Sequence, residues 1–124
     1  MKTRNNSSLR GKLGDKIRLN HILEAILEIE SYLMNAELEL FMENSMMRFA
    51  CIKQMEIIGE ASNHISNETK NIFSEIEWSQ IVGMRNVFVH EYFGVDGRLV
   101  WEIIKNDLPG FKMKIISIID AFNE

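Results

Sequence analysis

Residues 16–34 read KIRLNHILEAILEIESYLM, and this stretch decides the fold class of the chain. Its apolar residues recur at steps of three, four and seven positions, with glutamates between them. Because each residue of an α-helix rotates by about 100°, that spacing gathers apolar side chains on one helical face. The stretch therefore predicts an amphipathic helix from about Lys16 to Met34, with an inward face at Leu19, Leu23, Ile26 and Leu33.

The remaining sequence also favours helices over strands, because it has one proline, few glycines and no alternating run of β-branched residues. We expect a short turn near residues 38–42 and a long helix over about residues 45–65, with inward positions at Met46, Phe49, Ile52, Ile57 and Ile58. A short helix should follow the cap residues 66–69, and another helix should start at Trp78. We expect a last helix over about residues 97–122, capped by Asp96 and kinked or split at Pro109-Gly110. The predicted fold is all-α: an antiparallel four-helix bundle with a short extra helix and a kinked C-terminal helix.

A single domain accounts for a chain of 124 residues with 46% hydrophobic content, and we assign it to residues 15–124. The longest apolar runs are only a few residues long, which excludes a transmembrane span. The N-terminus also lacks the apolar stretch of a secretory signal. These features predict a cytoplasmic protein that does not bind a membrane.

A second stretch, residues 85–92, reads RNVFVHEY and concentrates chemically active side chains. Arg85 offers a planar fork to a phosphate and stays charged at physiological pH, whereas His90 can gain or lose a proton near pH 7. Asn86 lies one helical turn before His90, close enough to orient the ring or to hold a water. Arg85 and His90 are five positions apart, so a helix rotates them by roughly 140°. They could flank a groove or face a second copy of the motif.

This pattern of arginine, histidine and tyrosine resembles the motif of the HepT-like toxins, which are small helical ribonucleases of the HEPN group. The resemblance covers roughly residues 15–122 and includes further signatures, which are Arg18-Leu19 with His21-Ile22-Leu23, Glu56-Ile57-Ile58-Gly59-Glu60-Ala61, Trp78, Val95-Asp96, and Val100-Trp101-Ile103-Ile104 with Leu108-Pro109. It implies a toxin that cleaves RNA, a homodimer whose two motifs face each other across a shared cleft, and a nucleotidyltransferase antitoxin. In the family this tyrosine accepts AMP from the antitoxin, which makes Tyr92 the expected modification site.

RNA cleavage by such a motif would involve attack of a 2′-hydroxyl on the adjacent phosphorus and departure of the 5′-oxygen, with no metal ion or cofactor. His90 is expected to transfer protons, Arg85 to stabilise charge on the non-bridging oxygens, and Asn86 to position the ring or the phosphate. The alternative is a non-catalytic helical dimer that binds the nucleotidyltransferase or a nucleotide. Tyr92 also has a structural alternative, which is to end its helix with a half-buried ring.

The net charge of −4 is unusual for a protein that binds RNA. Cations concentrate in the first eighteen residues, where Asp15 is the sole acidic residue. Residues 1–14 therefore predict a basic, flexible tail, with an RNA-contacting arm as the alternative.

The other candidate ligands and reactive groups favour structural roles. Glu60 and His64 have a spacing that could hold a divalent ion, yet a helix-surface pair is the more common outcome, and no metal site is predicted. Cys51 lies among apolar residues and is expected to be a small buried hydrophobe. Trp78 and Trp101 could stack on bases, but core anchors are favoured, and the eight methionines are expected mainly to fill the core.

Overall fold

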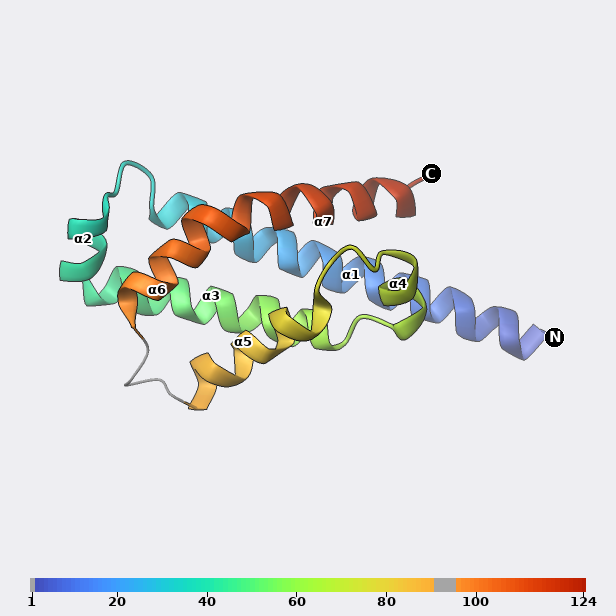
Figure 1. Ribbon diagram of the computed structural model, residues 1–124. Helices are drawn as coiled ribbons and strands as arrows, with labels where there is room; N and C mark the ends of the chain where they lie inside the picture. The colour runs from blue at the N-terminus through green and yellow to red at the C-terminus, as the bar shows by residue number, and fades with distance from the viewer. Residues whose placement is uncertain (1, 91–95) are drawn as a thin grey trace.

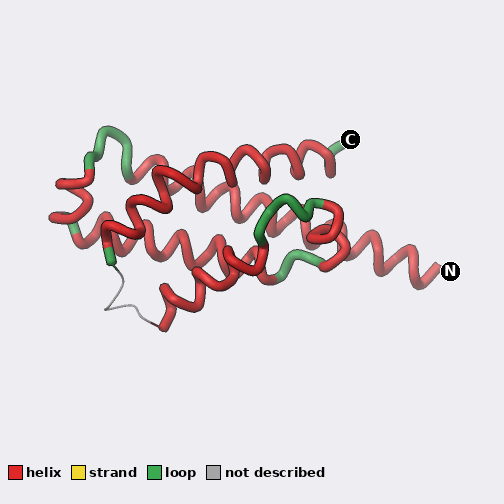
Figure 2. Tube along the Cα trace, in the orientation of Figure 1, coloured by secondary structure: helices red, strands yellow, loops and turns green. Residues whose placement is uncertain are grey.

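A computed structural model describes residues 2–90 and 96–124, with side chains placed for residues 11–84 and 96–124. The elements are α1 (Lys2–Tyr32), α2 (Leu38–Glu43), α3 (Ser45–Asn63), α4 (Asn67–Ile72), α5 (Trp78–His90), α6 (Gly97–Glu102), the π-helical turn η2 (Ile103–Asp107) and α7 (Leu108–Phe122). These described residues contain helices and loops but no strand (Figure 2). The all-α prediction is confirmed.

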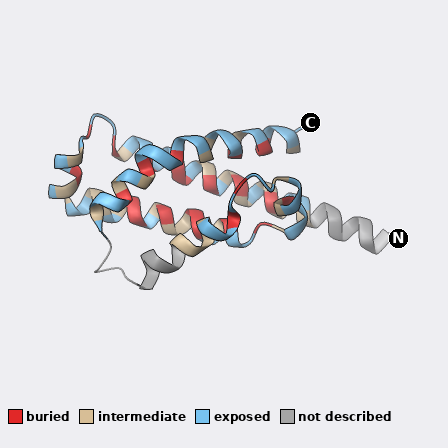
Figure 3. Ribbon diagram, in the orientation of Figure 1, coloured by how far each residue is buried: buried red, intermediate tan, exposed pale blue. Residues whose placement is uncertain are grey.

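The long helices lie side by side, and consecutive ones run in opposite directions (Figure 1). α1 packs against both α3 and α7, α3 also packs against α5, and α2 packs against α3 and α6. The helices bury their facing sides, as Figure 3 shows in red. The fully covered core includes Leu19, Ile22, Ile26 and Ile29 of α1, Met55 and Ile58 of α3, and Ile115 and Ile118 of α7.

The N-terminal helix is longer than the sequence pattern predicts. α1 begins at Lys2, so the predicted start near Lys16 is too late. The apolar periodicity did not predict the helical turns before Lys16, because an amphipathic pattern arises only where a helix packs against a core. Among the side chains that are described, Asp15 is the first buried one. The flexible tail assigned to residues 1–14 stays a prediction.

The buried face of α3 also differs from the predicted one. Ile52 and Ile58 are buried as expected, but Met46 is 83% exposed and Phe49 is 41% exposed. Cys51, Met55, Ile58 and Ser62 define the buried face. At about 100° per residue, Met46 lies on the opposite side of the helix. The prediction that Met46 and Phe49 point inward is wrong.

The predicted helix caps are confirmed, whereas the break in the last helix lies elsewhere. Asp96 accepts a hydrogen bond from the Arg98 backbone N–H at 2.9 Å, and the Ser66 hydroxyl accepts one from the Thr69 N–H at 3.3 Å. The helix departs from α geometry at η2, and Pro109 lies in the first turn of α7. Pro109 cannot donate to the carbonyl four residues earlier, and its ring would clash there, so the wider turn precedes the proline.

Candidate active site

The corner that leads into α5 is tied to α1 by a buried carboxylate. Asp15 is 2% exposed. Its Oδ1 accepts a hydrogen bond from the Ser66 N–H at 2.9 Å, and its Oδ2 accepts bonds from the hydroxyls of Ser66 and Thr69, both at 2.6 Å. These three bonds fix the first turn of α4 against α1. They therefore also fix where the segment between α4 and α5 begins.

The start of α5 is fixed by Trp78. Its indole N–H donates to the Phe73 carbonyl at 3.2 Å, and its side chain is 7% exposed. The expected role of Trp78 as a core anchor, rather than as a platform for a base, is confirmed. α5 begins at this anchor and ends at His90. The contacts of Trp78 at its first turn therefore set the direction in which the helix runs.

The residues Arg85, Asn86 and His90 all lie on α5, which ends at His90. Their predicted placement on one helix is confirmed. Helical geometry separates Arg85 from His90 by about 7.5 Å along the axis and by about 140° around it, and it brings Asn86 within about 40° of His90. The side chains at positions 85–90 lie outside the described residues, and Tyr92 lies outside them entirely, so their chemical roles stay predictions.

The turn that precedes the motif is only partly covered by the rest of the chain. Ile81, Val82, Gly83 and Met84 are each half-buried, although consecutive positions face all sides of a helix. α5 packs against α3 and lies at the edge of the bundle (Figure 1). Such a helix leaves surface beside the motif that a substrate or a second chain can cover.

A groove of about 460 Å³ lies beside α5, between that helix, α3 and the segment formed by η2 and α7. Its apolar lining includes Met55, Ile58, Ile81, Met84 and Phe111, and its polar lining is Glu75, Glu77, Gln80, Asn106, Asp107 and Lys114. The groove extends to Met84, which directly precedes Arg85. Three carboxylates against one ammonium group disfavour a phosphate, so this groove is a poor binding site for a polyanion.

No pattern in the sequence predicts the groove. Gln80 and Asn106 contribute polar groups to it from α5 and η2, which are separated along the chain. A single sequence does not reveal which polar residues of distant helices meet.

The sequence model of the family described as "Ribonuclease HepT-like" matches residues 22–118. The chain belongs to the HepT-like ribonuclease family.

Curated relatives extend the match over most of the chain. A candidate RNase of Methanocaldococcus jannaschii is 38% identical over 81% of this chain and 92% of its own length. The "Probable ribonuclease HepT" of Thermococcus cleftensis is 41% identical over 83% of this chain and 94% of its own length. No solved structure is significantly similar to the chain.

The region that matches the HepT-like family includes the motif but not the N-terminal residues. Residues 22–118 include Arg85, Asn86, His90 and Tyr92, whereas the first turns of α1 precede the matched region. The motif thus belongs to the part of the chain that is shared with the family.

The remaining candidates have structural environments. His64 Nε2 lies 3.0 Å from Glu60 Oε1 at the exposed end of α3, which is the helix-surface pair that the spacing favours. Burial raises the pKa of the Cys51 thiol to about 11, so its reactive thiolate is scarce near neutral pH. The half-buried Trp101 packs on Phe41 with ring centroids 5.2 Å apart. Trp101 therefore belongs to the edge of the core.

Within the described residues, no three histidine, cysteine or carboxylate side chains are grouped as metal ligands. Among the same residues, no helix combines the length and the apolar character that crossing a bilayer requires.

Proposed function

We propose that this HepT-like protein is the toxin of a toxin–antitoxin pair, a cytoplasmic endoribonuclease that cleaves RNA without a metal ion. A nucleotidyltransferase antitoxin neutralises it by transferring AMP to Tyr92. The observation that carries the proposal is the unbroken course of α5 through Arg85, Asn86 and His90 inside the region that matches a ribonuclease family. This helix brings a fixed cation, an amide and an imidazole within two turns of one another.

The proposed reaction needs only these groups. A base removes the proton of the ribose 2′-hydroxyl, the 2′-oxygen forms a bond to phosphorus, and the bond to the 5′-oxygen breaks. The 5′-oxygen takes a proton from an acid, and the other fragment ends in a 2′,3′-cyclic phosphate. His90 serves proton transfer because an ordinary imidazole exchanges protons near neutral pH. Arg85 stabilises the charge that grows on the non-bridging oxygens, and Asn86 positions the ring or the phosphate.

The proposed active form is a homodimer with its two motifs facing each other. The separation of about 140° between Arg85 and His90 supports this arrangement, because one helix cannot easily turn both residues towards the same phosphate. The half-buried turn of Ile81 to Met84 also supports it, since that turn leaves apolar surface beside the motif. In such a dimer, His90 of one protomer acts beside Arg85 of the other.

Cleavage of single-stranded RNA in the presence of EDTA tests the proposed reaction. The expected products carry cyclic phosphate ends, and His90→Ala should lower the rate by about 10²- to 10⁴-fold. Arg85→Lys should also be strongly impaired because it keeps the charge but loses the fork. His64→Ala and Arg98→Lys change an exposed histidine and an exposed arginine, and both should cleave like wild type.

A fully active His90→Ala variant with a native helical spectrum would contradict the assignment of the reaction. Complete absence of cleavage by wild type, together with tight binding of the transferase or of a nucleotide, would establish the non-catalytic alternative.

Control of the enzyme is tested separately at Tyr92. An AMP group adds a negative phosphate two residues from His90, where it competes for the Arg85 fork and repels RNA within the screening length of about 8 Å at physiological salt. Tyr92→Phe should stay toxic and escape neutralisation by the transferase. Tyr32→Phe is the matched control, because Tyr32 is the one other tyrosine and its hydroxyl is held by Gln54 at 3.1 Å. AMP-sized mass additions on peptides without Tyr92 would refute this mode of control.

A further inference from the structure

Positive charge is concentrated in one part of this molecule. Residues 1–18 contain six lysines and arginines and one acidic residue, which gives them a net charge of +5. The other 106 residues contain eight lysines and arginines and seventeen acidic residues, for a net charge of −9. We call residues 2–18 the basic arm. Its cations are Lys2, Arg4, Arg10, Lys12, Lys16 and Arg18.

The single acidic residue of the basic arm does little to offset these cations. Asp15 is 2% exposed, and both of its carboxylate oxygens accept hydrogen bonds from Ser66 and Thr69. These donors are neutral and leave its charge of −1 in place, so six cations against one carboxylate keep the arm at a net charge of +5.

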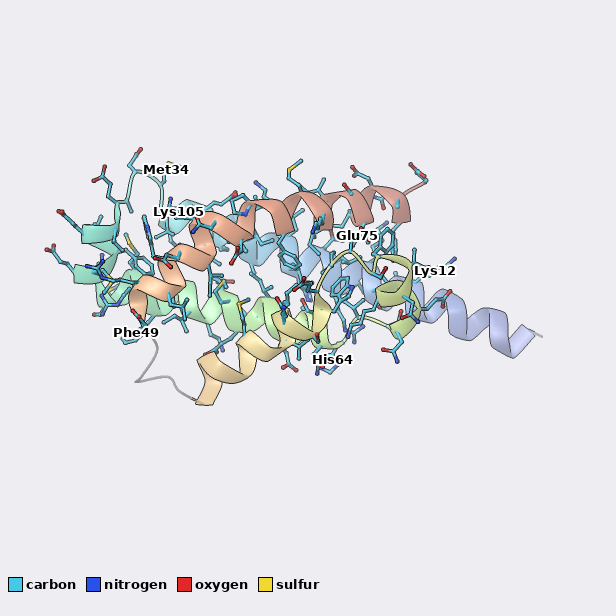
Figure 4. All side chains as sticks on the ribbon, in the orientation of Figure 1. Lys12, Met34, Phe49, His64, Glu75 and Lys105 are labelled. Carbon is cyan, nitrogen blue, oxygen red and sulfur yellow. The ribbon has the colours of Figure 1, made fainter. Side chains whose placement is uncertain are left out.

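The basic arm is helical and extends beyond the bundle. α1 starts at Lys2, and its N-terminal turns continue past α4 and past the end of α7 (Figure 1). Lys12 and Leu13 are exposed, and Lys12 lies where α1 passes α4 (Figure 4). At about 1.5 Å per residue, the turns that precede Asp15 are roughly 20 Å long. A rod of this length can reach several successive phosphates.

The basic arm, residues 2–18, also precedes the region that the family model matches, which begins at residue 22. The family model therefore does not account for these cations. The acidic remainder, with a net charge of −9, repels a polyanion. A ribonuclease with such a body needs another source of phosphate affinity.

We propose that the basic arm binds the phosphate backbone of the RNA substrate and recruits it to the motif. This inference rests on the proposed ribonuclease function. At helical spacing, the six sequence positions that carry these cations fall around the whole circumference of α1, with no gap wider than about 80°. A helix that docks on a protein surface keeps one side free of charge, whereas a flexible polyanion can engage cations on every side.

A second copy of the chain is the competing partner for this surface. Leu13 and Ile17 are 62% and 48% exposed, and the groove beside α5 is lined by apolar side chains and by three carboxylates. These two side chains would bury only a small apolar area. Charge on all sides of the helix favours RNA, and the experiment includes the other outcome.

The test measures RNA binding in the His90→Ala background, so that it does not depend on cleavage. A fluorescently labelled single strand of about 20 nucleotides is titrated at several salt concentrations and followed by anisotropy. The arm variant is Lys12→Gln with Lys16→Gln. The matched control is Lys53→Gln with Arg98→Gln, two exposed cations outside the arm whose replacement changes the net charge equally.

The arm variant should bind about tenfold more weakly at low salt. Its slope of log affinity against log salt should fall by about 1.4, because each phosphate contact contributes about 0.7 for a single strand. The RNA affinity of the control variant should fall by less than twofold. Equal losses in the two variants, or no binding by the parent protein, would overturn the proposal.

Sedimentation of the same variants separates the two partners. If the arm variant binds RNA as well as its parent but forms smaller assemblies, the arm docks on a second copy and the proposal is wrong. If wild type fails to cleave RNA while the arm variant still loses binding, the arm proposal stands and the ribonuclease proposal fails.

Discussion

Replacing Asp15 by asparagine should lower the free energy of unfolding by about 1–3 kcal/mol, although the two side chains have nearly the same shape. In the native protein, both carboxylate oxygens accept hydrogen bonds, from one backbone N–H and two hydroxyls. Asparagine keeps one carbonyl oxygen for the Ser66 N–H, but its amide group then faces hydroxyls that must turn and accept. A bond to a charged acceptor contributes about 1 kcal/mol more than a neutral one, and all three bonds lose their charged acceptor.

Complete removal of the acceptor should cost more. Asp15→Ala leaves the Thr69 hydroxyl without its acceptor in a site where Thr69 is only 4% exposed. We expect a loss of about 3–5 kcal/mol, because a buried polar group without a partner adds its desolvation penalty. Urea unfolding followed by circular dichroism measures these changes, at one protein concentration so that any association contributes equally.

The controls isolate the Asp15 contacts from a general effect of charge. Asp120→Asn removes an exposed carboxylate and should change stability by less than about 0.5 kcal/mol. A double-mutant cycle of Asp15→Asn with Thr69→Val should give a coupling energy of about 1 kcal/mol. If Asp15→Asn costs no more than Asp120→Asn, or if the cycle shows no coupling, Asp15 does not hold the α4 corner as described.

Two further predictions concern buried polar groups of α3. Ser62→Ala should leave the free energy of unfolding unchanged or raise it by up to about 1 kcal/mol, because the Ser62 hydroxyl is fully buried and has no hydrogen-bond partner among the described residues. A clear loss of stability in thermal unfolding would show that the hydroxyl has a partner. Burial raises the pKa of Cys51 from 9.0 to about 11, so the buried thiol contributes stability below pH 9 that is lost as the pH rises through 11. The difference in unfolding free energy between wild type and Cys51→Ala should shrink between pH 9 and 11, and a constant difference would contradict the burial argument.

Local signals predicted much of the fold. The periodicity of residues 19–33 located the buried side of α1, and the cap residues Ser66 and Asp96 located the starts of α4 and α6. These features act within a few residues of one another. The first turns of α1 could not be predicted in the same way, because a helix without a core contact has no amphipathic pattern.

Contacts between distant segments were the part that sequence could not supply. Nothing near Asp15 indicates that its hydrogen-bond donors are Ser66 and Thr69, more than fifty positions later. The groove beside α5 likewise depends on how η2 and α7 pack. The motif could be recognised from the sequence because Arg85, Asn86 and His90 lie within six consecutive positions.

The π-helical turn η2 has a consequence for how this chain tolerates changes in length. A π turn accommodates about one residue more than an α turn, because its hydrogen bonds span five residues rather than four. Deleting one residue within Ile103–Asp107 can convert the turn to α geometry while Ile115 and Ile118 keep their orientation towards the core. The same deletion inside α7 would rotate every later residue by about 100° and expose that apolar face. Single-residue deletions should therefore be tolerated at η2 and excluded from α7.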